Sequence, residues 1–91
     1  MDDIQPPSQS KILIIRLSSI GDIVLTTPVV RAVNEQLPQM EVHYLVRKDY
    51  VPVVETNPHI HKVHAYDPEN VSQTIEELKN EQFEVVIDLQ K

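Results

Sequence analysis

The sequence predicts an α/β fold with a Rossmann-like parallel sheet, and three observations support this. Two short runs of mostly β-branched apolar residues, 12–15 and 85–87, suit strands that are buried on both faces. Helical periodicity follows the first run almost at once. Strand and helix signals then alternate as βαβαβαβ, which favours right-handed crossovers. With the two most apolar strands at the centre, the predicted strand order is 3-2-1-4.

The first helix is expected over residues 21–37, shortly after the strand at 12–15. It begins at Gly21, the one glycine in the sequence, and ends before Pro38. Pro28 lies inside it and removes one backbone hydrogen bond, at a cost of about 3 kcal/mol in a regular helix. We therefore expect a kink or an irregular first turn near this proline.

The middle of the chain contains shorter elements. A strand with alternating polarity is expected at 41–46, followed by a short helix at 50–56 that Asp49 caps. The strand expected at 60–66 has interleaved histidine and lysine residues, which indicates an edge position with one wet face.

The last helix is expected over residues 68–80, with Asp67 as its N-cap and Pro68 at its first position. Its apolar side consists of Val71, Ile75 and Leu78. The acids on the other side are interpreted as a solvated face. The final strand, 83–89, is predicted to be buried on both faces, although the strand order places it at an edge. We infer from this conflict that the chain is the N-terminal part of a longer protein.

The composition narrows the possible functions. The formal net charge is −6 and the 8 basic residues are scattered, which argues against binding a nucleic-acid backbone. The absence of cysteine excludes disulfides and thiolate metal sites and favours a reducing compartment. No apolar run approaches membrane-spanning length. Residues 1–10 are acidic and polar, so we expect a disordered leader rather than a signal peptide.

The turn between the first strand and the first helix is the expected site. Ser19 and Asp22 have the spacing of a capping box, in which the acid faces the positive end of the helix. Free amides at such a corner can bind an anion, and ligands of open α/β sheets bind at this end of the strands. The strand order brings Asp88 to the same crevice. Spacing alone favours a capping role for Asp22, and Asp88 can equally bind a loop amide.

Four histidines raise the question of a metal site. His59 and His61 share one face of their predicted strand and His64 takes the other, with no well-placed third ligand. We therefore predict no metal. Neither a G-x-G-x-x-G nor a G-x-x-x-x-G-K-[ST] pattern occurs, which excludes dinucleotide-binding and P-loop sites of those types.

The segment KILIIRLSSIGDIVLTTP, residues 11–28, closely resembles the N-terminal signature of the ADP-heptose:lipopolysaccharide heptosyltransferases, glycosyltransferase family 9. The similarity continues through QLPQMEVHYLV, NPHIHKVHAYD and FEVVIDLQK. This resemblance implies a GT-B enzyme, in which an N-terminal Rossmann-like domain holds the sugar acceptor and a C-terminal domain holds the nucleotide-sugar donor. Residues 11–91 would be the acceptor-side domain, truncated before the donor domain, and we expect this piece alone to be inactive.

The resemblance also implies roles for individual residues. The acid of the family's S-S-x-G-D motif falls on Asp22, which would be the catalytic base of an inverting transfer. The other matching positions would bind substrate, either in the turn before the helix or in the D-x-Q stretch at the end of the fourth strand. They are Ser18, Ser19, Gly21, Asp88 and Gln90.

The reaction that the resemblance implies is transfer of heptose from ADP-heptose to the inner core of lipopolysaccharide. No cofactor is expected besides this nucleotide-sugar donor, which is a substrate. The expected location is the cytoplasm, and the alternatives are a free protein and one bound peripherally to the cytoplasmic face of the inner membrane. The alternative is a non-catalytic α/β module that binds an anion or nucleotide at the same corner, and donor-dependent transfer distinguishes the two.

Overall fold

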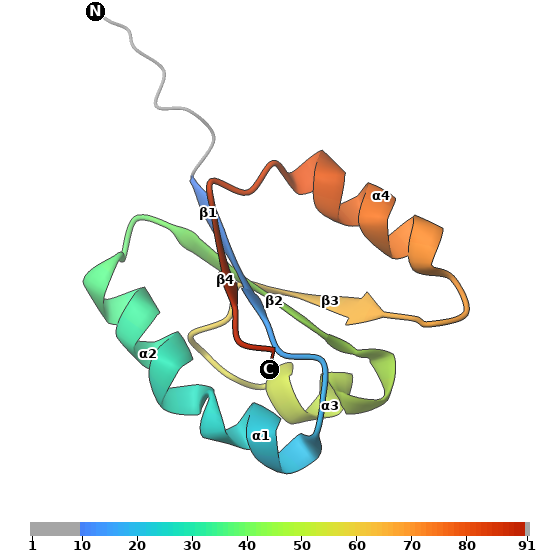
Figure 1. Cartoon of the computed structure of the whole chain (residues 1–91). Coiled ribbons are helices and arrows are strands. Elements are labelled where there is room, and N and C mark those ends of the chain that lie inside the picture. The colour runs from blue at the N-terminus through green and yellow to red at the C-terminus, as the bar shows by residue number, and fades with distance from the viewer. Residues whose placement is uncertain (1–9, 91) are drawn as a thin grey trace, which may run out of the picture.

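The chain folds into a four-stranded parallel sheet with helices on both faces (Figure 1). The computed structural model describes residues 10–90. The strands are β1 (Lys11–Ile15), β2 (Glu41–Arg47), β3 (Lys62–Tyr66) and β4 (Val85–Asp88). The helices are α1 (Ile20–Leu25), α2 (Thr27–Gln36), α3 (Val51–Val54) and α4 (Val71–Glu81), with a 3-10 turn η1 at Lys48–Tyr50. The expected leader lies outside the described residues, except for Ser10.

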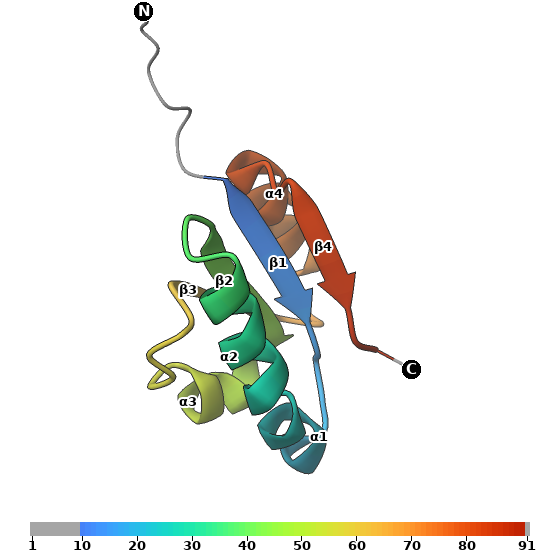
Figure 2. The same ribbon diagram turned by 90° about the vertical axis from the view of Figure 1, so that its left-hand side faces the viewer.

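The strand order is β3-β2-β1-β4 and every pair is parallel, which confirms the predicted topology. Ile14 of β1 lies opposite Tyr44 of β2 and Ile87 of β4. Helices α1, α2 and α3 lie on one face, and α4 lies on the other (Figure 2). The carboxyl ends of β1 and β4 therefore meet at one edge of the sheet, as the prediction of a shared crevice requires.

The main core lies between the sheet and the helices α1 to α3. Its buried members are Ile12, Ile14, Ile23, Val30, Met40, Val42, Tyr44, Val46 and Val54. Each large side chain buried there contributes about 1.5–3 kcal/mol relative to an exposed one. Strand β2 is buried on both faces, because His43 and Leu45 on the α4 side are only 1% and 6% exposed. The polar residues that alternate along this strand therefore do not mark a wet face.

The single helix predicted over residues 21–37 is two helices, α1 and α2, separated at Thr26. Pro28 occupies the first turn of α2, where its missing amide hydrogen costs nothing and its fixed φ angle suits the helix. The Thr26 hydroxyl donates to the carbonyl of Ile23 at 2.6 Å and closes α1. The irregularity expected near Pro28 is confirmed, and it takes the form of a complete break.

Helix α4 begins at Val71, three residues later than predicted. Asp67 instead forms a turn, in which its carboxylate accepts from the amide of Glu69 and its carbonyl from the amide of Asn70, both at 2.9 Å. Its predicted apolar side is also wrong, because Val71 and Ile75 are exposed and Thr74 is buried. The reason is the polar character of the sheet beneath α4, where the buried histidines are found.

Two further elements differ from the prediction. The helix expected at 50–56 is reduced to α3, and Asp49 lies inside η1 without capping it. Strand β4 is an edge strand, but Val85 and Val86 are 41% and 55% exposed, so the predicted burial on both faces is wrong for the described chain. The edge position of β3 is confirmed. Within residues 10–90, no helix has the length and apolar character needed to cross a membrane.

Candidate functional site

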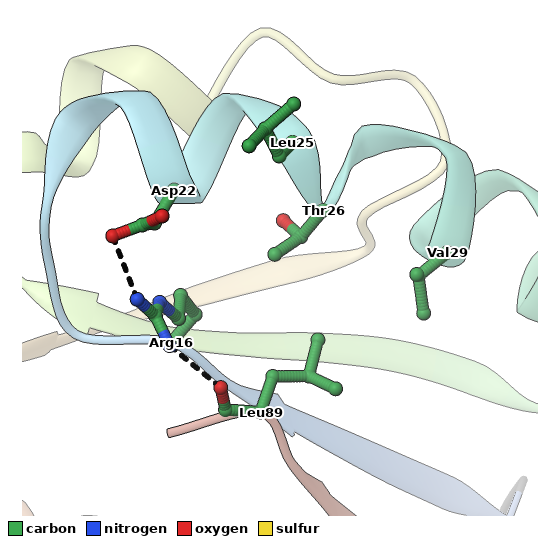
Figure 3. A pocket seen from close by; sticks show the side chains of 6 residues that line it. All are labelled: Arg16, Asp22, Leu25, Thr26, Val29 and Leu89. Atoms are coloured by element: carbon green, nitrogen blue, oxygen red, sulfur yellow. Dashed lines mark hydrogen bonds and ion pairs between the residues drawn. The ribbon is translucent and has the colours of Figure 1, made fainter. Parts of the chain in front are cut away.

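A hollow of about 240 Å³ opens at the carboxyl end of the sheet, beside the break between α1 and α2 (Figure 3). Its lining comes from the end of β1, from both helices and from the segment after β4. The lining residues are Arg16, Asp22, Leu25, Thr26, Val29 and Leu89. This is the crevice that the predicted strand order placed between the first and fourth strands.

Asp22 lies in the first turn of α1, and its side chain is half exposed at the hollow. Its Oδ2 atom lies 2.7 Å from Nη2 of Arg16 and accepts a hydrogen bond from the Ser19 hydroxyl at 3.1 Å. The hydrogen bond from Arg16, followed by those from Ser19, lowers the pKa of the Asp22 carboxyl below its usual value. Asp22 is therefore ionised at neutral pH.

Ser19 occupies the N-cap position of α1, as the capping-box spacing predicts, but its side chain makes no capping hydrogen bond. Its hydroxyl donates to Asp22 instead of accepting from a first-turn amide. This bond is charge-assisted, because its acceptor is a carboxylate. The short helix start is thus organised around the carboxylate of Asp22.

Arg16 is the site residue that sequence reasoning missed. Its side chain is 12% exposed, and Nη1 donates to the carbonyl of Leu89 at 2.7 Å while Nη2 pairs with Asp22. The sequence did contain a signal, because Arg16 is the first charged residue after the buried run of β1 and therefore lies at the same strand end as Asp22.

Asp88 and Gln90 hold the segment after β4 in place. The amide of Leu17 donates to Oε1 of Gln90 at 2.8 Å, and the amide of Gln90 donates to Oδ1 of Asp88 at 2.9 Å. Asp88 thus binds a loop amide, which is one of its two predicted roles. Both residues lie beside the crevice without lining the hollow, and their contact with substrate stays a prediction.

Ser18 lies in the turn before α1, and Gly21 is the second residue of that helix. The peptide bond between Ser18 and Ser19 is cis. A Cβ atom added to Gly21 would meet nothing within 4 Å beyond its chain neighbours and its own helix backbone, so a side chain at this position would enter open space. A substrate role for these two residues stays a prediction.

A second polar cluster lies under α4, on the opposite face of the sheet. Nδ1 of His43 and Nε2 of His64 are 2.9 Å apart, and both side chains are 1% exposed. The outer ring nitrogens face Glu41 at 3.0 Å and Glu77 at 3.2 Å. Burial lowers the pKa of His64, although the hydrogen bond that its ring donates to Glu77 opposes this shift. The acids of α4 are therefore only partly solvated, contrary to the prediction.

Glu81 is the third residue of this cluster with a ligand atom near both histidines. Its two carboxylate oxygens are already paired with Lys11 at 2.9 Å and with Lys62 at 2.6 Å. Nδ1 of His43 and Nε2 of His64 are also closer together than the roughly 3.3 Å that two ligands of a tetrahedral zinc ion would have. His43, His64 and Glu81 are thus the candidate ligands among residues 10–90, but their geometry suits hydrogen bonds and ion pairs. The three histidines considered from the sequence do not come together.

No family model matches the sequence. The curated protein "Lipopolysaccharide heptosyltransferase 3" of Escherichia coli (strain K12) is 27% identical over 78 residues, which cover 76% of this chain and 23% of that protein. A glycosyl transferase family 9 structure from Veillonella parvula DSM 2008 has a TM-score of 0.81 at 21% identity, over 96% of this chain and 28% of that one. The resemblance to glycosyltransferase family 9 is confirmed.

Two further solved structures share the fold. E. coli heptosyltransferase WaaC with ADP has a TM-score of 0.75 at 20% identity, over 86% of this chain and 27% of that one. E. coli ADP-heptose lps heptosyltransferase II has a TM-score of 0.72 at 17% identity, over 86% of this chain and 24% of that one. The chain therefore spans about a quarter of the length of the proteins it matches.

Proposed function

We propose that this chain is the acceptor-side domain of an inverting GT-B glycosyltransferase that transfers heptose from ADP-heptose to the inner core of lipopolysaccharide. The observation that carries the proposal is the position of Asp22, an ionised carboxylate at the mouth of a hollow at the carboxyl end of a parallel sheet. The similarity to heptosyltransferases supports the choice of donor and acceptor. The missing donor domain would lie outside this chain.

In the proposed reaction, a hydroxyl oxygen of the acceptor attacks the anomeric carbon of the heptose. The bond from this carbon to the ADP oxygen breaks on the opposite face, so the configuration inverts and ADP leaves. The acceptor proton passes to the carboxylate of Asp22, which must lie within about 2.6–3.2 Å of that hydroxyl. Because the pKa of Asp22 is lowered, it is a weak base, and proton transfer should follow most of the glycosidic bond formation.

The proposal includes no cofactor besides the nucleotide sugar, which is a substrate. Ser18 and Ser19 would contact the acceptor from the turn and Gly21 from the start of α1, and Asp88 and Gln90 would support the crevice from the other side. The proposed location is the cytoplasmic face of the inner membrane, where peripheral contact would bring the enzyme to a lipid-linked acceptor. The absence of cysteine agrees with this reducing compartment.

The alternative is a module that binds an anion at the same corner. Asp22 argues against it, because its carboxylate already occupies the first turn of α1 and pairs with Arg16, the basic residue of the hollow. A second anion would be repelled by this acid unless the ion pair opened first. The geometry thus favours proton acceptance over anion binding.

A transfer assay on the full-length protein that contains this chain tests the proposed function. ADP-heptose and a lipopolysaccharide acceptor that lacks inner-core heptose are incubated with the protein, and a mass increase of one heptose on the acceptor is expected. A matched reaction with ADP-glucose in place of ADP-heptose controls for donor selection. Binding of ADP without any transfer, for a panel of acceptors that differ in core length, would contradict the proposal and favour the binding module.

A further inference from the structure

Arg16 connects three segments that are far apart in the sequence. It leaves the end of β1, its Nη1 atom donates to the carbonyl of Leu89 after β4, and its Nη2 atom pairs with Asp22 on α1. Both distances are 2.7 Å, which is the range of strong charge-assisted contacts. Figure 3 shows the guanidinium group between the helix above and the strand ends below.

The guanidinium group is buried more deeply than the acid it binds. The side chain of Arg16 is 12% exposed, whereas that of Asp22 is 49% exposed. Nε of Arg16 is also buried and has no hydrogen-bond partner among the described residues. The two terminal nitrogens, with their contacts to Leu89 and Asp22, therefore fix the orientation of this side chain.

The contacts of Asp22 with Arg16 and with the Ser19 hydroxyl fall on the same oxygen, Oδ2. Two contacts on one oxygen restrict the rotation of the carboxylate as well as its position. The rest of the hollow beside it consists mainly of Leu25, Thr26 and Val29, which offer no other charge to orient the acid. The direction of the Asp22 carboxylate therefore depends on Ser19 and Arg16, and Arg16 makes the shorter, charged contact.

We infer that Arg16 is a positioning residue for transfer, because it holds the Asp22 carboxylate at the mouth of the hollow and links it to the segment after β4. This inference rests on the proposed role of Asp22 as catalytic base. Arg16 has no direct part in the chemistry. Its effect is to keep the base ionised and to present it in one orientation, which raises the fraction of bound acceptor in a productive geometry.

A purely structural role for Arg16 makes a different prediction. If it served only to fix Leu89, its loss would lower the stability of the sheet edge without changing the proton affinity of Asp22. If it positions Asp22, its loss changes the titration of that carboxyl. A charge-retaining lysine restores part of the effect, because it keeps the ion pair but loses the two-pronged geometry of the guanidinium group.

The first test is an NMR titration of the Asp22 side-chain carboxyl carbon in the full-length protein that contains this chain. We expect the titration midpoint to rise in Arg16→Met toward that of an ordinary aspartate, and to take an intermediate value in Arg16→Lys. Arg31→Met is the matched control, because Arg31 lies on the exposed surface of α2 and pairs with Glu35. An unchanged midpoint in folded Arg16→Met would overturn the inference.

A second measurement covers the case in which Arg16→Met does not fold. In the Asp22→Asn variant, the guanidinium nitrogen signals of Arg16 should shift and its Nη protons should exchange with solvent faster than in the wild-type chain. The guanidinium signals of Arg31 serve as the internal reference. Unchanged signals and unchanged exchange for Arg16 would show that the pair does not form, and the inference would be wrong.

The same variants in the full-length protein separate the inference from the proposed function. We expect kcat for heptosyl transfer to fall at least tenfold in Arg16→Met, with KM for donor and acceptor changed less than about threefold. Arg16→Lys should recover part of kcat. If Asp22→Asn abolishes transfer but Arg16→Met retains it, the inference fails alone. If Asp22→Asn retains transfer, the proposed catalytic base fails.

Discussion

Thr26 and Tyr44 share a buried hydrogen bond that ties the break between α1 and α2 to the central strand β2. Oγ1 of Thr26 lies 2.8 Å from Oη of Tyr44, and the same Oγ1 donates its one proton to the carbonyl of Ile23 at 2.6 Å. Tyr44 must therefore be the donor of the pair. Burial raises the pKa of Tyr44, so its hydroxyl keeps the proton that this bond requires. Since Thr26 lines the hollow, the bond also supports the candidate site.

Removing the two partners one at a time should have unequal effects. Thr26→Val leaves the Tyr44 hydroxyl buried without an acceptor and should lower the free energy of unfolding by about 1–3 kcal/mol. Tyr44→Phe leaves Thr26 still bonded to Ile23 and should cost only about 0.5–1.5 kcal/mol. Urea unfolding of both variants and of the double variant measures the difference. A larger loss in Tyr44→Phe than in Thr26→Val would contradict the donor assignment.

Glu81 should stabilise the fold at neutral pH but not in strong acid. Its hydrogen bonds with Lys62 and Lys11 lower the pKa of Glu81 from 4.5 to about 2. A carboxyl pKa that is lower in the folded chain stabilises the fold at every pH above the pKa of the unfolded chain. This stabilisation is lost as the pH falls from about 4.5 to about 2. Because Lys62 is half exposed, water screens the pair, and Glu81→Gln should cost only about 1 kcal/mol at pH 7.

The check is urea unfolding of the wild type and Glu81→Gln at several pH values. The difference in unfolding free energy should be largest at neutral pH and should disappear near pH 2. Glu35→Gln is the control, because Glu35 pairs with Arg31 at the exposed surface of α2. An equal effect of the two substitutions at pH 7 would show that Glu81 has no special anchoring role.

His64 should make the stability of the fold depend on pH in the mildly acidic range. Burial lowers the pKa of its ring below the ordinary value of 6.5. The unfolded chain then binds a proton more readily than the folded one, so stability is complete above that value and decreases as the pH falls through it. Unfolding of the wild type at pH 7.5 and at pH 5.5 (roughly one unit either side of that ordinary value) should show this decrease. His64→Gln cannot take up the charge and should show a smaller change, and an equal change in both would contradict the assignment.

Most of the topology could be predicted because it depends on local patterns. The apolar runs of β1 and β4, and the alternation of strands and helices, are enough to give the strand order. The contacts of α4 could not be predicted in this way. Its apolar side faces solvent, because the sheet beneath it carries the histidine pair and the lysines that bind Glu81. Such a polar layer depends on contacts between residues distant in the sequence. The packing of Phe83, whose ring lies edge-on against both histidines, depends on such contacts too.

The candidate site shows the same division. Asp22 could be found from its motif and from its place after a buried strand. Arg16 could not, because its importance depends on Leu89, 73 residues away, and on the direction of its side chain across the strand end. Similarly, the strand order predicts Asp88 at this crevice and the family resemblance adds Gln90, but their hydrogen bonds with backbone amides appear only in the folded chain.

The most direct test of the central claim compares Asp22→Asn with the wild type in the full-length protein. Asparagine keeps the size of the side chain and still accepts from Ser19, but it cannot take a proton from the acceptor. We expect kcat for heptosyl transfer to fall by about 10²–10⁴-fold, the range that acid–base groups contribute, while the variant stays folded. Transfer that stays within a few-fold of the wild type, in a folded protein, would contradict Asp22 as the catalytic base.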